Sequence, residues 1–200
     1  MTVPGSPERP RSRPSRAPAG KIVVTGPFDA GKTTFVRTIT GGTAVATERA
    51  VTGHEDGTTT VAMDFGRLAL APDLSLHLFG TPGQDRFEFM WDILAEGMLG
   101  SVVVVDVTRP GALEEARHIR EAFARLGDVP QVIAVNKVTG SSDAAVATVR
   151  RTLEIPVHVP VLVVDARDRA SVKRVLVVLL HVVRDRLRAA PPARTGGLTS

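Results

Sequence analysis

The stretch GPFDAGKT at residues 26–33 decides the fold of this 200-residue chain. It matches the pattern G-x-x-x-x-G-K-[ST], directly after the apolar run at 22–24 and directly before a stretch with helical spacing. In this context the glycines allow successive backbone N–H groups to point at phosphate oxygens, and the helix start adds its positive end. The stretch therefore predicts a phosphate-binding loop, and the alternative is a glycine turn without a ligand.

Individual residues of this loop have separate expected roles. Lys32 supplies a cation to the outer phosphates, where it also assists catalysis. The hydroxyl of Thr33 is a predicted ligand of Mg²⁺, a hard ion that prefers oxygen. Further contacts to the nucleotide are expected from Gly26, Asp29, Ala30, Gly31 and Thr34.

From Lys21 onward, short valine-rich runs alternate with longer amphipathic stretches, as in parallel sheets with crossover helices. Strands are expected at 21–25, 61–70, 74–79, 101–107, 131–136 and 161–165, and helices at 32–40, 86–99, 111–126, 142–153 and 168–188. The turn at 71–73 is too short for a helix, so its flanking strands should form an antiparallel hairpin. The pattern predicts an α/β fold of the P-loop NTPase G-domain type: a six-stranded, mainly parallel sheet with one antiparallel strand and helices on both faces.

Composition divides the chain into a disordered arm rich in proline and arginine at 1–20, a G domain at 21–190 and a disordered tail at 191–200. There is no cysteine, so disulfides and thiolate sites are excluded. No apolar run approaches the ~20 residues that cross a bilayer. The net charge is +4, but the basic residues form no stripe with interleaved aromatics, so nucleic-acid binding is not expected. Direct membrane insertion is not expected either. We predict a cytoplasmic protein.

A polar stretch at 52–60 precedes the second expected strand. It resembles the first switch of small GTPases, in which a threonine beside the strand closes over Mg²⁺ and the γ-phosphate. Its position makes Thr60 the candidate metal ligand. The alternative is a threonine-rich loop in which this residue has no ligand role.

The stretch FGTPGQDRF at 79–87 resembles the D-x-x-G-Q-E second switch of the Ras superfamily. The resemblance implies that the N–H of Gly83 contacts the γ-phosphate and that Gln84 orients the attacking water. Gly80 stands where the superfamily carries an aspartate that holds Mg²⁺ through water. Asp64 and Asp29 are the candidate replacements for that carboxylate.

The stretch NKVT at 136–139 resembles the base-binding motif N-K-x-D, which Asn136 and Lys137 match. Thr139 replaces the aspartate that accepts two hydrogen bonds from guanine, and Asp143 is the candidate substitute. A strand-end cap is the alternative role for the asparagine. The stretch DAR at 165–167 stands in place of S-A-K, which implies that Ala166 presents its N–H to the base carbonyl and that Arg167 stacks on the ring.

Together GPFDAGKTTF, TTTVAMDFG and FGTPGQDRF resemble the small GTP-binding proteins of actinobacterial conservons, relatives of the Ras and Arf group, over residues 21–188. This implies a switch that binds GTP or GDP with Mg²⁺ and hydrolyses GTP slowly, with Arg49 and Arg86 as candidate arginines in cis. It implies partners too: a Roadblock/LC7-type regulator, a short second protein and a sensor-kinase-like membrane protein, with membrane recruitment through them. Alternatives are a non-hydrolysing nucleotide-binding interaction module and a P-loop ATPase or kinase.

Two helices of this pattern carry wide apolar faces. After the second switch, Phe87, Met90, Trp91 and Leu94 share one face, while Phe89 and Ile93 lie on another. One face must pack on the sheet, and the other is either an exposed binding surface or further core. The last helix, with apolar rows from Val172 to Leu187, is expected to pack as core.

Overall fold

The structure, a computed structural model, describes residues 19–42, 45–52, 58–83, 89–127 and 129–189. For residues 45–52, 58–62 and 89 it describes the backbone and not the side chains. The predicted arm up to residue 18 and the tail from 190 lie outside these ranges. The first strand already begins at Ala19, which pairs with Ser75, so it starts two residues before its expected start at Lys21.

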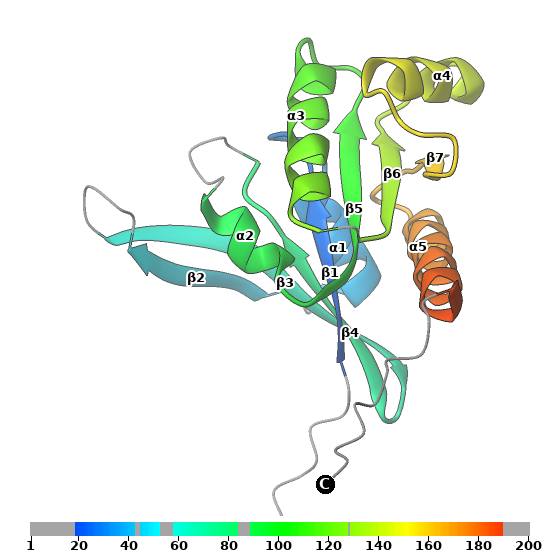
Figure 1. The fold of residues 1–200 in the computed structure, drawn as a ribbon. Helices are drawn as coiled ribbons and strands as arrows, with labels where there is room; N and C mark the ends of the chain where they lie inside the picture. Colours follow the sequence, from blue (N-terminus) through cyan, green and yellow to red (C-terminus); the bar gives the residue numbers. More distant parts are fainter. Residues whose placement is uncertain (1–18, 43–44, 53–57, 84–88, 128, 190–200) are drawn as a thin grey trace, which may run out of the picture.

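The described residues form a sheet of seven strands in the order β2-β3-β4-β1-β5-β6-β7 (Figure 1). Neighbouring strands are parallel except for β3, which is antiparallel to both β2 and β4. The strands are β1 (Ala19–Thr25), β2 (Val45–Thr52), β3 (Thr58–Ala71), β4 (Leu74–Gly80), β5 (Met98–Asp106), β6 (Gln131–Asn136) and β7 (Val161–Val163).

Within the described ranges, five helices cover the two faces of this sheet. They are α1 (Lys32–Thr40), α2 (Phe89–Ala95), α3 (Ala112–Arg125), α4 (Ser142–Thr152) and α5 (Arg169–Ala189). Helices α1 and α5 share one apolar core with the sheet, whereas α2, α3 and α4 pack into clusters built on the other side chains of β1, β5 and β6. The central strands carry buried side chains toward both faces, which explains their continuous valine runs.

The fold class predicted from the sequence is confirmed. All six expected strands are present, and among the strands of the described residues β3 alone runs against the others. The strand count needs correction, because residues 45–52 add β2 along the outer edge of β3. No element was predicted for residues 45–51, and the stretch VATERAVT has no continuous apolar run.

The amphipathic helices bury the faces that their spacing predicts. In α2, Met90, Trp91 and Leu94 are at most 5% exposed, whereas Ile93 is 57% exposed. The described part of α2 therefore has one core face and one exposed apolar residue. In α5 the buried residues include Val172, Val175, Leu176, Leu179 and Val183. None of the helices in the described ranges combines the length and apolar character needed to cross a bilayer.

The order of the strands brings loops with chemistry to one edge of the sheet. Strand β1 pairs with β4 on one side and with β5 on the other, and the chain passes across it from β4 to β5. The strand order therefore reverses at β1. Ligands of open α/β sheets bind beside the carboxyl ends of strands at such a point. The loops that follow β1, β5, β6 and β7 all begin there.

A glycine on β3 sets the distance between the sheet and α1. A Cβ atom on Gly66 would lie 2.6 Å from Thr40 Cγ2 and 3.0 Å from Val36 Cγ1. We expect Gly66→Val to lower the free energy of unfolding by about 1–3 kcal/mol, the usual cost of an overpacked core. Denaturant unfolding measures this change. Ala69→Val, at an exposed position of the same strand, is the control and should stay within about 0.5 kcal/mol of the parent protein; equal losses in both variants would contradict the packing argument.

Candidate functional site

The phosphate loop links the end of β1 to the start of α1. Gly26 and Gly31 have φ angles of 137° and 104°, which side chains rarely adopt. A Cβ atom at Gly31 would lie 2.4 Å from Asn136 Nδ2, and one at Gly26 would lie 2.1 Å from the carbonyl oxygen of Val104. Both glycines are therefore needed for the loop to curl against the neighbouring strands.

Lys32 lies at the centre of this loop with only 8% of its surface exposed. Its Nζ atom donates to the carbonyl oxygens of Gly26 at 2.8 Å and Pro27 at 2.6 Å. Burial lowers the pKa of Lys32 to about 8, and the nearby carboxylates of Asp64 and Asp29 oppose this shift only in part. The ammonium group is thus held inside the loop, where a bound phosphate would compensate its burial.

The carboxylate of Asp64 lies beside the residue predicted to bind the metal. The hydroxyl of Thr33 donates a hydrogen bond to Asp64 Oδ2. Asp64 pairs with Gly80 across β3 and β4, and a Cβ atom at Gly80 would lie 3.4 Å from Asp64 Oδ2. The glycine therefore leaves space for a carboxylate that comes from the adjacent strand. Of the two candidate replacements, Asp64 is the one in contact with the threonine.

Gly83 approaches the phosphate loop from the segment after β4. A Cβ atom there would lie 2.5 Å from Lys32 Nζ and 2.7 Å from the backbone nitrogen of Phe28. This close approach requires glycine. It places the start of the predicted second switch directly against the loop.

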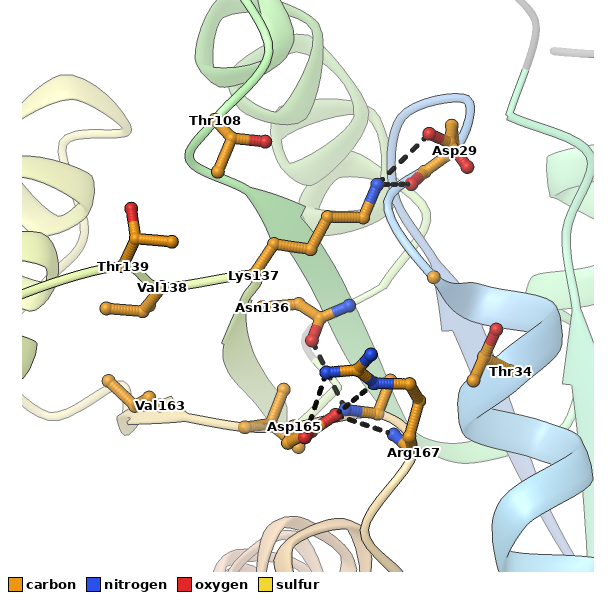
Figure 2. A pocket seen from close by; sticks show the side chains of 13 residues that line it. Asp29, Thr34, Thr108, Asn136, Lys137, Val138, Thr139, Val163, Asp165 and Arg167 are labelled. Atoms are coloured by element: carbon orange, nitrogen blue, oxygen red, sulfur yellow. Dashed lines mark hydrogen bonds and ion pairs between the residues drawn. The ribbon is translucent and has the colours of Figure 1, made fainter.

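A cavity of about 540 Å³ opens next to the phosphate loop (Figure 2). Its walls come from the phosphate loop, α1 and the segments that follow β5, β6 and β7. The lining residues are Asp29, Gly31, Thr34, Thr108, Asn136, Lys137, Val138, Thr139, Val163, Val164, Asp165, Ala166 and Arg167. Such a volume suits the base and sugar of a nucleotide whose phosphates lie on the loop.

Lys137 spans the upper part of this cavity. Its Nζ atom lies 2.9 Å from Asp106 Oδ2 and 3.0 Å from Asp29 Oδ2, and it donates to the Asp29 carbonyl at 2.8 Å. Burial alone would raise the pKa of Asp106, but hydrogen bonds from Lys137 and Thr108 outweigh it and lower that pKa. Hydrogen bonding to Asp106 raises the pKa of Lys137 in turn. The pair is therefore ionised at neutral pH.

Asn136 connects the phosphate loop to the segment after β7. Its Nδ2 atom donates to the carbonyl oxygen of Ala30 at 2.9 Å, and its Oδ1 atom accepts from the backbone N–H of Ala166 at 3.2 Å. The side chain is buried. It does more than cap a strand, because both of its polar atoms bridge separate loops of the site.

The DAR segment forms the lower wall of the cavity (Figure 2). Asp165 Oδ1 accepts from the backbone N–H of Arg167 at 2.9 Å and from its Nε at 3.1 Å. The side chain of Arg167 is 84% exposed and lies at the rim of the cavity. Its predicted stacking on a base remains a prediction.

Several predicted site residues do not contribute a described side chain here. Gln84 and Arg86 lie outside the described residues. Thr60 lies within β3 and pairs with Ala50 rather than forming part of a loop, and its side chain is outside the described part. The side chain of Arg49 on β2 is outside it as well. Asp143 is in the first turn of α4 and is not among the residues that line the cavity.

Two carboxylates of the site were not among the residues predicted from the sequence. Asp106 ends a buried valine strand, and a polar residue at that position of a parallel sheet is a signal for a site. Asp165 was noted only as part of the segment at 165–167. The resemblance to S-A-K placed this segment at the base, but it assigned roles to Ala166 and Arg167 and none to Asp165, because the motif carries a serine at that position.

Comparison with known proteins places the chain in a nucleotide-binding family. A family model described as a conserved hypothetical ATP-binding protein matches residues 44–185, and the chain belongs to this family. The chain is also similar to an uncharacterized protein of Methanocaldococcus jannaschii, with 32% identity over 117 residues that make up 58% of this chain and 69% of the archaeal protein.

The pKa of Lys32 leads to a prediction for the pH dependence of phosphate binding. A pKa of about 8 leaves the free ammonium group mostly protonated at pH 7 and mostly neutral at pH 9. Because the charged form is the one that binds phosphate, we expect the affinity for a nucleoside triphosphate to fall about tenfold between these values. Titration calorimetry at both pH values measures the change. Lys32→Arg is the control, because guanidinium stays charged; the same pH dependence in this variant would assign the effect to another group.

Proposed function

We propose that the protein is a small GTPase-like molecular switch, which binds GTP or GDP with Mg²⁺, hydrolyses GTP slowly and changes its affinity for partners between the two states. One observation carries the proposal: the groups suited to phosphate, metal and base converge at one edge of the sheet. Lys32 lies in the phosphate loop, Thr33 and Asp64 are hydrogen-bonded beside it, and Asn136 joins that loop to the base cavity. The same edge is where nucleotides bind in open α/β sheets.

The oxygen donors at the start of α1 fit Mg²⁺. A hydroxyl and a carboxylate in direct contact are the ligands that this hard cation takes from proteins, together with phosphate oxygens and water. When bound there, Mg²⁺ would neutralise charge on the outer phosphates. Two features of the sequence favour a non-hydrolysing module, Gly80 and Thr139, and Asp64 weakens the argument from the first of them. We propose Thr33 and Asp64 as the metal-binding residues, with Thr60 as a further ligand.

Hydrolysis needs a positioned water and compensation of charge on the transferred phosphate. Gly83 lies against the phosphate loop. Gln84 is the next residue in the sequence, and we propose that it orients the attacking water. Lys32 supplies positive charge to the outer phosphates. Arg109, whose charge contributes to lowering the pKa of Lys32, is held by Glu115 in two hydrogen bonds of 2.9 and 2.5 Å. We therefore propose that the catalytic arginine comes from Arg49, Arg86 or a partner protein. Hydrolysis is slow as long as none of these arginines reaches the transferred phosphate.

The signalling role rests on the segment beyond Gly83. That segment leads directly into α2, whose residue Ile93 is 57% exposed. A rearrangement next to the γ-phosphate would therefore reach an apolar surface position. The proposed partners remain a Roadblock/LC7-type regulator and a sensor-kinase-like membrane protein, which would bring the protein to the membrane.

Identification by mass spectrometry of the nucleotide that copurifies with the protein tests the proposal as a whole. GTP or GDP would support it. ATP or ADP would favour a P-loop ATPase, in keeping with the description of the family. The two outcomes distinguish guanine from adenine nucleotides, but both require a phosphate loop. The phosphate loop is therefore tested separately, by the pH dependence of triphosphate binding described above.

The role of Asp64 predicts a metal-specific defect. In Asp64→Asn the amide keeps the shape of the side chain but loses its charge, so we expect the affinity for GTP in the presence of Mg²⁺ to fall about tenfold or more. Affinity measured with EDTA should change little. Asp73→Asn, in the exposed turn between β3 and β4, is the control. Equal weakening with and without Mg²⁺ would argue that Asp64 supports the loop and not the metal.

The role of Gln84 predicts a defect in chemistry without a defect in binding. Leucine fills a similar volume but cannot orient water, so Gln84→Leu should lower the single-turnover rate of GTP hydrolysis by about tenfold to a hundredfold. Rapid mixing with radiolabelled GTP measures the rate, and equilibrium binding should stay within about twofold. Gln131→Leu, at the start of β6 and far from the carboxyl edge, is the matched control. An unchanged rate in Gln84→Leu would remove this residue from the mechanism.

A further inference from the structure

The cavity next to the phosphate loop contains a carboxylate, although the stretch NKVT at 136–139 has none. Position 139 carries a threonine, whose hydroxyl is neutral. Of the residues that line the cavity, only Asp29 and Asp165 are acidic. Asp29 is engaged by Lys137 at the phosphate end, with 3.0 Å between Oδ2 and Nζ. Asp165 is on the opposite wall, in the segment after β7, and is the carboxylate available to a base (Figure 2).

The backbone of Asp165 is fixed from two sides. Its N–H donates to Ser171 Oγ in α5 at 3.1 Å. Strand β7, which precedes Asp165, pairs with β6: Val163 is the partner of Val135, the residue directly before Asn136. The residue therefore follows the strand adjacent to the one that carries the base-binding asparagine. This register places the carboxylate and Asn136 in walls of the same cavity.

The side chain of Asp165 is ionised and retains accepting capacity. Hydrogen bonds from the side chain and the backbone of Arg167 lower its pKa. Those bonds use Oδ1 mainly, because the contact of Oδ2 with Arg167 Nη2 is 3.4 Å long. A carboxylate offers about four lone-pair positions, and the Asp165 side chain is 51% exposed, so acceptor sites remain open to a ligand.

We propose that Asp165 is the residue that selects guanine, by accepting hydrogen bonds from the N1–H and the 2-amino group of the base. This inference rests on the proposed nucleotide-binding function. Adenine has a lone pair at N1 and no amino group at position 2, so it would place an acceptor against the carboxylate. An ionised acceptor therefore favours guanine by more than a neutral threonine hydroxyl can. Asp143 has no part in this selection, since it does not line the cavity.

Asp165→Asn tests the inference through a change of base preference. Xanthine carries a carbonyl where guanine carries the 2-amino group, and an asparagine amide can donate to that carbonyl while its oxygen still accepts from N1–H. We expect the variant to bind GTP about tenfold to a hundredfold more weakly and xanthosine triphosphate more tightly than the unmodified protein does. Competition of GTP, ATP and xanthosine triphosphate against a fluorescent GDP derivative measures the preference. Asp143→Asn is the matched control and should keep the original order.

Each outcome of this experiment has a definite meaning. A loss for GTP with a gain for xanthosine triphosphate supports the inference, because damage to the loop would weaken all three nucleotides together. An equal loss of affinity for all three nucleotides, or an unchanged base preference, overturns the inference. Neither result contradicts the proposed nucleotide-binding function. A preference of the unmodified protein for ATP also overturns it without touching the phosphate loop. Failure of the unmodified protein to bind any of the three would overturn the proposed function as well.

Discussion

The ion pairs of Lys137 hold together the three segments on which the site depends. Its ammonium group joins Asp106 at the end of β5 to Asp29 in the phosphate loop, while the residue itself follows β6. Asp106 is 1% exposed, so its charge is stable there only with hydrogen-bond donors around it. The Lys137 side chain is 36% exposed, so solvent screens part of this attraction, but removing the lysine would leave the buried carboxylate of Asp106 without its ionic partner. The contact that shapes the cavity is therefore also one that the fold cannot easily lose.

This contact also makes the site rigid before a ligand arrives. Lys137 has a φ angle of 57°, a left-handed conformation that costs roughly 1–2 kcal/mol for a residue with a side chain. Its ion pairs offset that cost and fix the direction of the side chain. Asn136 adds a second link through its bonds to Ala30 and Ala166. Because the loops are already joined, a nucleotide would lose less free energy to ordering them on binding.

The sequence predicts most of the fold, because buried valine strands and amphipathic helices have clear periods. It does not predict β2, whose residues 45–52 have no apolar run and form a strand by pairing with β3. The phosphate loop could be predicted because its residues are contiguous. Asp64 could be named only as a candidate, because its position beside Thr33 depends on the register between β3 and β4. Asp165 was missed for a different reason: the motif S-A-K carries a serine at that position, so the resemblance assigned it no role.

Two departures from the sequence motifs share one physical explanation. At Gly80 the motif lacks a carboxylate, yet Asp64 places one next to the same backbone from the paired strand. At Thr139 it lacks another, and in the proposed site Asp165 supplies one from an adjacent segment. Electrostatic energy depends on where a charge lies and on what screens it, and not on which residue carries it. A comparison that scores each motif position alone would count two losses of function, whereas the folded chain has one carboxylate beside Gly80 and another that lines the same cavity as Thr139. Judging whether such a chain can bind Mg²⁺ or select a base therefore requires the register of its strands as well as its motifs.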